Sequence, residues 1–101
     1  MPIYDAREVD KKPEFVGGME QFYRYVGKKF LAPDNNKSGK IFMKFVIELD
    51  GSLTHIEVIR DDVGGTSEAV RVILNSPKWI PGENKGKKVR TNFALPITIA
   101  R

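Results

Sequence analysis

The chain has 101 residues, of which 41% are hydrophobic and 30% are charged, a composition typical of one small globular domain. A chain of this length builds only a small core, so a large buried active-site cavity is not expected. The formal net charge of +4 is compatible with an acidic partner, a nucleic acid or simple solubility. The absence of cysteine excludes disulfides and thiolate chemistry.

The first twelve residues are polar and resemble an N-terminal arm or the end of a linker, so we place the domain at residues 13–101. No apolar run is long enough to cross a bilayer, and we expect any membrane anchor of the natural protein to lie outside this sequence. After Gly17 and Gly18, apolar residues recur at helical spacing and predict an amphipathic helix of about three turns that ends before Pro33. Its apolar positions are Met19, Phe22, Tyr23, Val26 and Phe30.

Alternating apolar residues predict two strands, at residues 40–49 and 53–60. They are joined by Asp50 and Gly51, a pair that favours a tight hairpin turn because glycine accepts a positive φ. The inward face of the first strand is predicted to carry Ile41, Met43, Phe45, Ile47 and Leu49.

A second helix is predicted to begin after the loop at residues 61–65, with Thr66 or Ser67 as its cap, and to end before Pro77. Residues 79–88 are predicted to be a loop in which Trp79 anchors the core. The last strand is predicted at residues 89–99, with Val89, Thr91, Phe93, Leu95, Ile97 and Ile99 facing inward. The predicted fold class is α+β, with two helices packed on a three-stranded antiparallel sheet in the order α-β-β-α-β.

Catalytic chemistry is not indicated. His55 is the one histidine and lies on a predicted strand without a nucleophile and orienting group beside it in the sequence. Asp61 and Asp62 are neighbours whose side chains are expected to point apart, in a solvated loop. We therefore predict no enzyme activity, no metal and no cofactor.

Several short motifs in this order resemble the C-terminal domain of TonB proteins. The segment PEFVGG at residues 13–18 is similar to the opening of the family, and GKIFMKFVI at residues 39–47 followed by DGS is similar to its first strand and turn. EAVRVI at residues 68–73, PKWIPG at residues 77–82 and LPI at residues 95–97 complete the resemblance, which covers most of the chain. The family often has Tyr-Pro where this chain has Ala32 and Pro33.

The resemblance implies a non-enzymatic periplasmic domain of an energy transducer that is anchored in the inner membrane and works with ExbB and ExbD. The domain would bind the TonB box, a short peptide of TonB-dependent outer-membrane receptors, and so drive uptake of siderophores or glycans. A homodimer formed through the same strand is also implied. Because the Tyr-Pro dipeptide of the family lies near receptor contacts, Ala32 and Pro33 are candidate partner-binding residues.

Elementary sheet geometry independently supports one part of this expectation, the binding of a peptide strand at a sheet edge. Three strands cannot close a barrel, so the sheet must have edges, and Pro96 in the last strand is typical of an edge because it has no N–H to donate. An open edge is a template for an added peptide strand. The predicted partner-binding residues on this strand are Val89, Arg90, Thr91, Asn92, Phe93, Ala94 and Leu95. Of these, Arg90, Asn92 and Ala94 are expected to face away from the core and contact partner side chains.

Two alternatives remain at this stage. A TonB-like domain attached to a membrane sensor or peptidase would bind a different peptide. A small basic nucleic-acid binder would use the cluster of Lys85, Lys87, Lys88 and Arg90, although no aromatic base-stacking pattern surrounds it. A solvated loop is the simpler interpretation of that cluster, and we predict no nucleic-acid partner.

Overall fold

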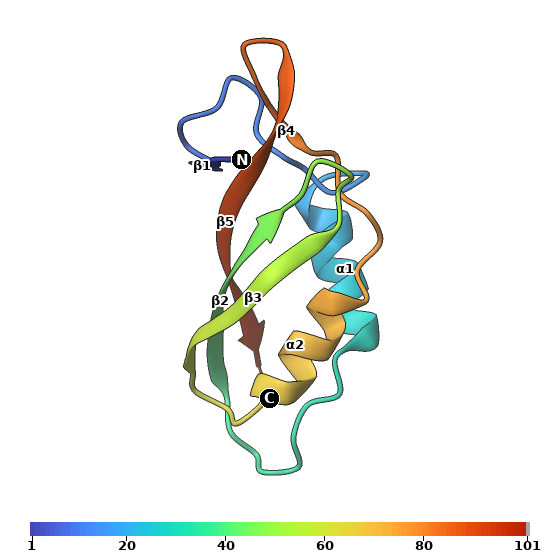
Figure 1. Cartoon of the computed structure of the whole chain (residues 1–101). Helices are drawn as coiled ribbons and strands as arrows, with labels where there is room; N and C mark the ends of the chain where they lie inside the picture. The colour runs from blue at the N-terminus through green and yellow to red at the C-terminus, as the bar shows by residue number, and fades with distance from the viewer. Residues whose placement is uncertain (101) are drawn as a thin grey trace.

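Two helices cover one face of a mixed five-stranded sheet in the computed structural model, which describes residues 1–100 (Figure 1). The elements in chain order are β1 (Ile3–Asp5), α1 (Met19–Lys29), β2 (Gly39–Ile47), β3 (Leu53–Asp61), α2 (Thr66–Leu74), β4 (Gly82–Asn84) and β5 (Lys87–Ile99). The strand order across the sheet is β1-β5-β2-β3, and β4 also pairs with β5. The predicted α+β class, both helices and the three long strands are confirmed.

The centre of the sheet is the antiparallel pair of β2 and β5, which stays in one register over nine residue pairs from Gly39↔Ile99 to Ile47↔Thr91. Alternation along each strand sends one set of side chains to the helices. On β2 this set is buried, at Ile41, Met43, Phe45 and Ile47. On β5, Leu95 and Ile97 are buried in the same layer, as the sequence pattern predicts.

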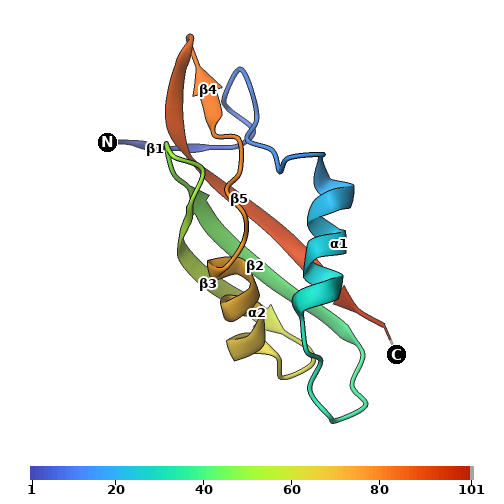
Figure 2. The same cartoon turned by 90° about the vertical axis from the view of Figure 1, so that its right-hand side faces the viewer.

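The helices lie over different parts of the sheet. α2 packs against β3, whereas α1 lies beside the C-terminal half of β5 (Figure 2). The predicted core role of Trp79 is confirmed, because this residue is only 3% exposed and makes edge contacts with the rings of Phe22 on α1, Phe45 on β2 and Phe93 on β5. Trp79 therefore joins α1 to the β2–β5 pair.

The hairpin between β2 and β3 closes at Asp50 and Gly51, as predicted. Gly51 has φ 85°, and a Cβ at this position would lie 2.0 Å from the carbonyl oxygen of Trp79. The Trp79 N–H donates to the Gly51 carbonyl at 2.8 Å. Glycine is thus required both for the turn and for the close approach of the segment that carries Trp79.

The predicted three-stranded antiparallel sheet is wrong, because two short strands were missed. β1 lies within the predicted arm and pairs with β5 in parallel, which makes the sheet mixed. β4 lies within the predicted loop at residues 79–88 and forms a hairpin with β5 through Lys85 and Gly86, both at positive φ. Three-residue strands are too short for alternation to reveal them.

The predicted cap of α2 is also wrong. The N-cap is Gly65, and no side chain caps the helix. The Thr66 hydroxyl instead donates to the Asp61 carboxylate at 2.6 Å, and that carboxylate also accepts the N–H groups of Val63 and Gly64. Asp61 therefore organises the loop that leads into α2.

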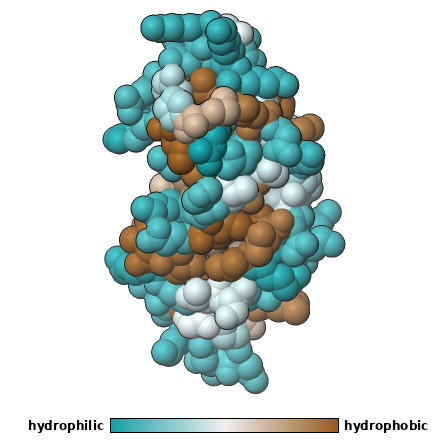
Figure 3. Space-filling model, viewed as in Figure 1, coloured by the Kyte–Doolittle hydropathy of each residue, from teal (hydrophilic) through white to brown (hydrophobic). Residues whose placement is uncertain are grey.

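The molecule is elongated, and its end at the β4–β5 hairpin is hydrophilic (Figure 3). Hydrophobic surface gathers around the middle of the view in Figure 3. Exposed large hydrophobic residues on the elements of this side include Ile59 on β3 and Leu74 on α2.

Candidate docking edge

The outer edge of β5, on the side away from β2, is the candidate docking site. Backbone groups of successive strand residues alternate between the two neighbours of a strand. The Asn92 carbonyl accepts the Ala6 N–H at 3.1 Å, and the Pro96 carbonyl accepts the Tyr23 hydroxyl at 3.3 Å, so both carbonyls point away from β2. By alternation, the N–H and C=O groups of Ala94 and Thr98 point to the same outer edge.

The N-terminal half of this edge is already occupied. β1 pairs in parallel with Arg90, Thr91 and Asn92. β1 therefore already covers the outward backbone groups of Arg90 and Asn92, two of the predicted partner-binding residues, whereas Val89 pairs with Gly82 of β4.

The C-terminal half of the edge has no strand partner among residues 1–100. Beyond Asn92, β5 pairs only with β2, through Phe93 and the residues that follow it. Its outward backbone positions are Ala94, Pro96 and Thr98. Of the predicted set, Ala94 therefore lies on the open part of the edge, and Phe93 and Leu95 are its neighbours along the strand. The open edge extends further toward the C-terminus than the predicted set, which ended at Leu95.

The side chain of Arg90, predicted to contact a partner, is paired within the domain. Its guanidinium donates to the Glu48 carboxylate at 2.6 and 3.0 Å, and both side chains are only 20% exposed. The Thr54 hydroxyl donates to the same carboxylate. The hydrogen bond from Arg90, and to a smaller extent that from Thr54, holds the pKa of Glu48 below its ordinary value. Arg90 instead fastens β5 to the β2–β3 hairpin.

Asn92 and Ala94 are exposed on the sheet face opposite the helices, as predicted. Together with Phe93 they line a shallow depression where β1 ends, next to Asp5 and Ala6. The carboxylate of Asp5 is held by Arg7, whose side-chain hydrogen bond lowers the pKa of Asp5 to about 2. The turn after β1 is thus fixed by local charge pairing beside the open edge.

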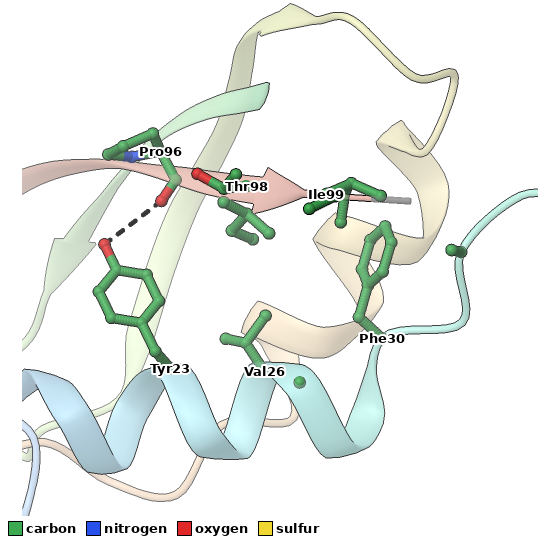
Figure 4. A pocket seen from close by; sticks show the side chains of 10 residues that line it. Tyr23, Val26, Phe30, Pro96, Thr98 and Ile99 are labelled. Atoms are coloured by element: carbon green, nitrogen blue, oxygen red, sulfur yellow. Dashed lines mark hydrogen bonds between the residues drawn. The ribbon is translucent and has the colours of Figure 1, made fainter. Parts of the chain in front are cut away.

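The structure brings Ala32 to the open edge but leaves Pro33 outside the same cavity. Ala32 lines a groove with Pro96, Ile97, Thr98 and Ile99. The other wall of that groove is formed by Tyr23, Val26 and Gly27 of α1 and by its C-cap residue Phe30 (Figure 4). The predicted helix included Phe30, which the structure places just after α1, and its periodicity could not show that these residues lie along the strand edge.

The remaining candidate residues lie at the end of β3 and in the β4–β5 hairpin. Within residues 1–100, no group of three His, Cys, Asp or Glu residues is placed to hold a metal ion. The carboxylates of Asp61 and Asp62 have separate partners, because Asp62 pairs with Arg60 at 2.8 Å whereas Asp61 accepts hydrogen bonds from the loop that follows it. Lys85, Lys87 and Lys88 are exposed at the tip of the β4–β5 hairpin. None of the helices in residues 1–100 is long and apolar enough to cross a membrane.

Comparison with known families decides the classification. Residues 31–98, about two thirds of the chain, match the family described as Gram-negative bacterial TonB protein C-terminal. The chain belongs to this family. TonB C-terminal domains are periplasmic interaction domains of energy transducers. Neither the curated proteins nor the solved structures gave a match.

The family match begins at residue 31 and therefore leaves out β1 and α1. In this TonB-type domain these two elements flank the outer edge of β5: β1 pairs with its first half, and α1 forms a groove with its second half. The outer edge of β5 thus belongs to the matched region, whereas β1 and α1, which flank it, belong to the thirty residues before the match.

Proposed function

We propose that this TonB-type domain docks onto outer-membrane receptors by accepting their TonB box as an added strand on the open half of β5. The observation that carries the proposal is the outward direction of the Ala94 and Thr98 backbone groups, which face no strand within residues 1–100. An extended peptide satisfies such groups by continuing the sheet.

The orientation of the added strand is suggested by the chain itself. β1 pairs with the same edge of β5 in parallel, through Ile3↔Arg90, Tyr4↔Thr91 and Asp5↔Asn92. A peptide strand that lies in line with β1, next to Ala94 and Thr98, would extend an existing parallel ladder. β1 and the peptide would then share one edge.

Backbone pairing alone gives a modest affinity. Ala94 and Thr98 offer four backbone groups, and each hydrogen bond contributes about 1 kcal/mol net. The sum of about 4 kcal/mol is at the lower end of the ~4–15 kcal/mol that association costs in lost freedom. Pro96 adds no donor, and its carbonyl already accepts the Tyr23 hydroxyl. The peptide must therefore also bury side chains against the domain.

The proposal is tested by NMR titration of the ¹⁵N-labelled domain with a synthetic peptide that carries the TonB box of an outer-membrane receptor. We expect the largest amide shifts at Ala94 and Thr98. Ala94→Pro removes an outward N–H without removing a hydrogen bond to β2, so it should weaken binding by about tenfold. Ala94→Ser keeps the N–H and serves as the matched control.

Shifts confined to the loop between β3 and α2, or equal affinity for the Ala94→Pro and Ala94→Ser variants, would contradict strand addition. The spectra of both variants must first show an intact sheet. This is expected because Ala94 is exposed and the sheet already accommodates Pro96 two residues later.

The wider role follows from the family. We propose that the full-length protein is anchored in the inner membrane by a segment outside this chain and couples ExbB and ExbD to receptors. The substrates carried, siderophores or glycans, would be set by the receptor. A second copy of the domain would compete for the same edge, so dimer formation in sedimentation runs should decrease when the receptor peptide is added.

A further inference from the structure

The groove between α1 and the open half of β5 extends the candidate docking edge. Its volume is about 520 Å³. Tyr23, Val26 and Phe30 point from α1 toward the strand, as Figure 4 shows, and Ile97 and Ile99 belong to the opposite wall. The lining contains no charged side chain. A ligand in this groove therefore has to be apolar where it meets the helix.

One wall of the groove is a strand edge, and this restricts the shape of the ligand. The backbone N–H and C=O groups of Ala94 and Thr98 point outward at this edge, beside the groove. A compact apolar molecule would shield these groups from water without forming hydrogen bonds to them, and burying unpaired polar groups costs free energy. An extended peptide satisfies them and, because its side chains alternate between the two faces of the sheet, sends every second side chain toward α1.

Gly27 opens space for such a side chain. A Cβ built on Gly27 would meet no heavy atom within 4 Å, although its neighbours along the helix face, Tyr23 and Phe30, are both large. The helix therefore has a gap between two aromatic residues, next to the strand edge. On the opposite face of the sheet, Ala94 borders the depression next to Asp5 and Ala6, whose lining also includes the charged side chains of Arg7, Lys12 and Lys44.

We infer that the groove over Gly27 binds a large apolar side chain of the receptor strand and so selects among peptides. This inference rests on the proposed function, because it requires the strand to lie along β5. It adds a second determinant to the backbone pairing: the edge accepts any extended chain, whereas the groove discriminates by side chain. Because α1 precedes residue 31, this determinant lies outside the family match.

The experiment fills the groove without touching the strand. Gly27→Leu places a side chain in the open space, and Gly27→Ala adds only a methyl group. Both should raise the thermal unfolding midpoint, because glycine is unfavourable within a helix. Lys28→Leu is the matched control, since Lys28 is exposed on the same helix and does not line the groove.

Binding of the synthetic TonB-box peptide is measured by isothermal titration calorimetry for all four proteins. We expect Gly27→Leu to weaken binding about tenfold or more, Gly27→Ala by less than about threefold, and Lys28→Leu to match the unmodified domain. In a second series, the apolar residues at alternate positions of the peptide are replaced by serine. Only one of the two alternate sets should weaken binding to the unmodified domain.

The outcomes separate the two proposals. If the peptide shifts the amides of Ala94 and Thr98 but binds Gly27→Leu as tightly as the unmodified domain, or if both serine sets are tolerated, the groove inference is wrong and strand addition stands. If the peptide fails to shift those amides in the unmodified domain, the proposed function is wrong and the groove inference falls with it. The peptide series needs no substituted protein, so it remains decisive even if Gly27→Leu lowers stability.

Discussion

The two outer edges of the sheet, at β5 and at β3, differ in regularity and charge. β5 keeps one register with β2 throughout, and its open half consists of uncharged residues. β3 carries extra residues at two places, where its register with β2 shifts, and His55 near one of them has φ 51°. Its exposed side chains include Glu57 and Arg60.

The comparison shows how one small sheet can offer one edge to a partner while protecting the other. Bulges and charged residues discourage pairing between edges, and both features are found on β3. The outer edge of β5 is protected only in part. β1 covers Arg90 to Asn92, and the Tyr23 hydroxyl donates a hydrogen bond to the Pro96 carbonyl. The open half of β5 is therefore short, regular and bordered by an apolar groove.

The largest expected effect is on stability, when Trp79, the core residue that joins β5 to α1 and β2, is truncated. Trp79→Ala should lower the free energy of unfolding by about 3–5 kcal/mol, because Trp79 is buried among rings of α1, β2 and β5. Urea unfolding measures the loss, and amide exchange should increase more in β5 than in β3. Leu74→Ala, at a residue 62% exposed, is the control. A loss below about 1 kcal/mol would contradict this role of Trp79.

A smaller effect is expected when the occupied half of the β5 edge is uncovered. Deleting residues 1–6 removes β1 and frees the outward backbone groups of Arg90 and Asn92, which doubles the number of positions available to a peptide. TonB-box peptide affinity, as measured by calorimetry, should rise at least tenfold, because up to four further hydrogen bonds of about 1 kcal/mol each outweigh the cost of ordering more of the peptide. Arg7→Ala, which disturbs only the turn after β1, should change affinity much less. Weaker binding by the truncated domain would show that β1 supports the partner strand and does not limit it.

The smallest effect concerns the ion pair that fastens the covered half of β5. Glu48→Gln should lower the free energy of unfolding by about 1 kcal/mol at pH 7. Because the folded state lowers the pKa of Glu48, the contribution is present above the ordinary carboxyl pKa of about 4.3 and is lost as the pH falls through the lowered folded value.

The difference between Glu48→Gln and the unmodified domain should accordingly shrink in urea unfolding below about pH 4. Glu57→Gln is the matched control on β3, where the pair with Lys44 spans 3.5 Å and both side chains are more than half exposed. An exposed pair of this kind contributes little. A difference that persisted unchanged at low pH would contradict the role assigned to the Glu48 charge.

Periodicity was sufficient to predict the long elements because each buries one face. The inward residues of β2 and β5, the apolar face of α1 and the Asp50–Gly51 turn all follow from local patterns. Trp79 was identifiable as a core residue from its size in a small domain. The Arg90–Glu48 pair was not, because it joins residues 42 positions apart.

The candidate site was predicted only in part. Pro96 correctly marked an edge of the sheet, since its missing N–H lies on the outer side of β5. The covering of Arg90 to Asn92 was missed because β1 is a three-residue strand whose partner lies at the other end of the chain. The groove was missed because the gap at Gly27 has meaning only once α1 is placed beside β5.

Amide hydrogen exchange tests the central claim most directly, because it reports which backbone N–H groups the receptor peptide covers. In the free domain, the outward amides of Ala94 and Thr98 should exchange rapidly. The TonB-box peptide should slow both of them and leave β3 unchanged. Protection that appears along β3 instead, or unchanged exchange at Ala94 and Thr98 in the saturated complex, would contradict docking at the open half of β5.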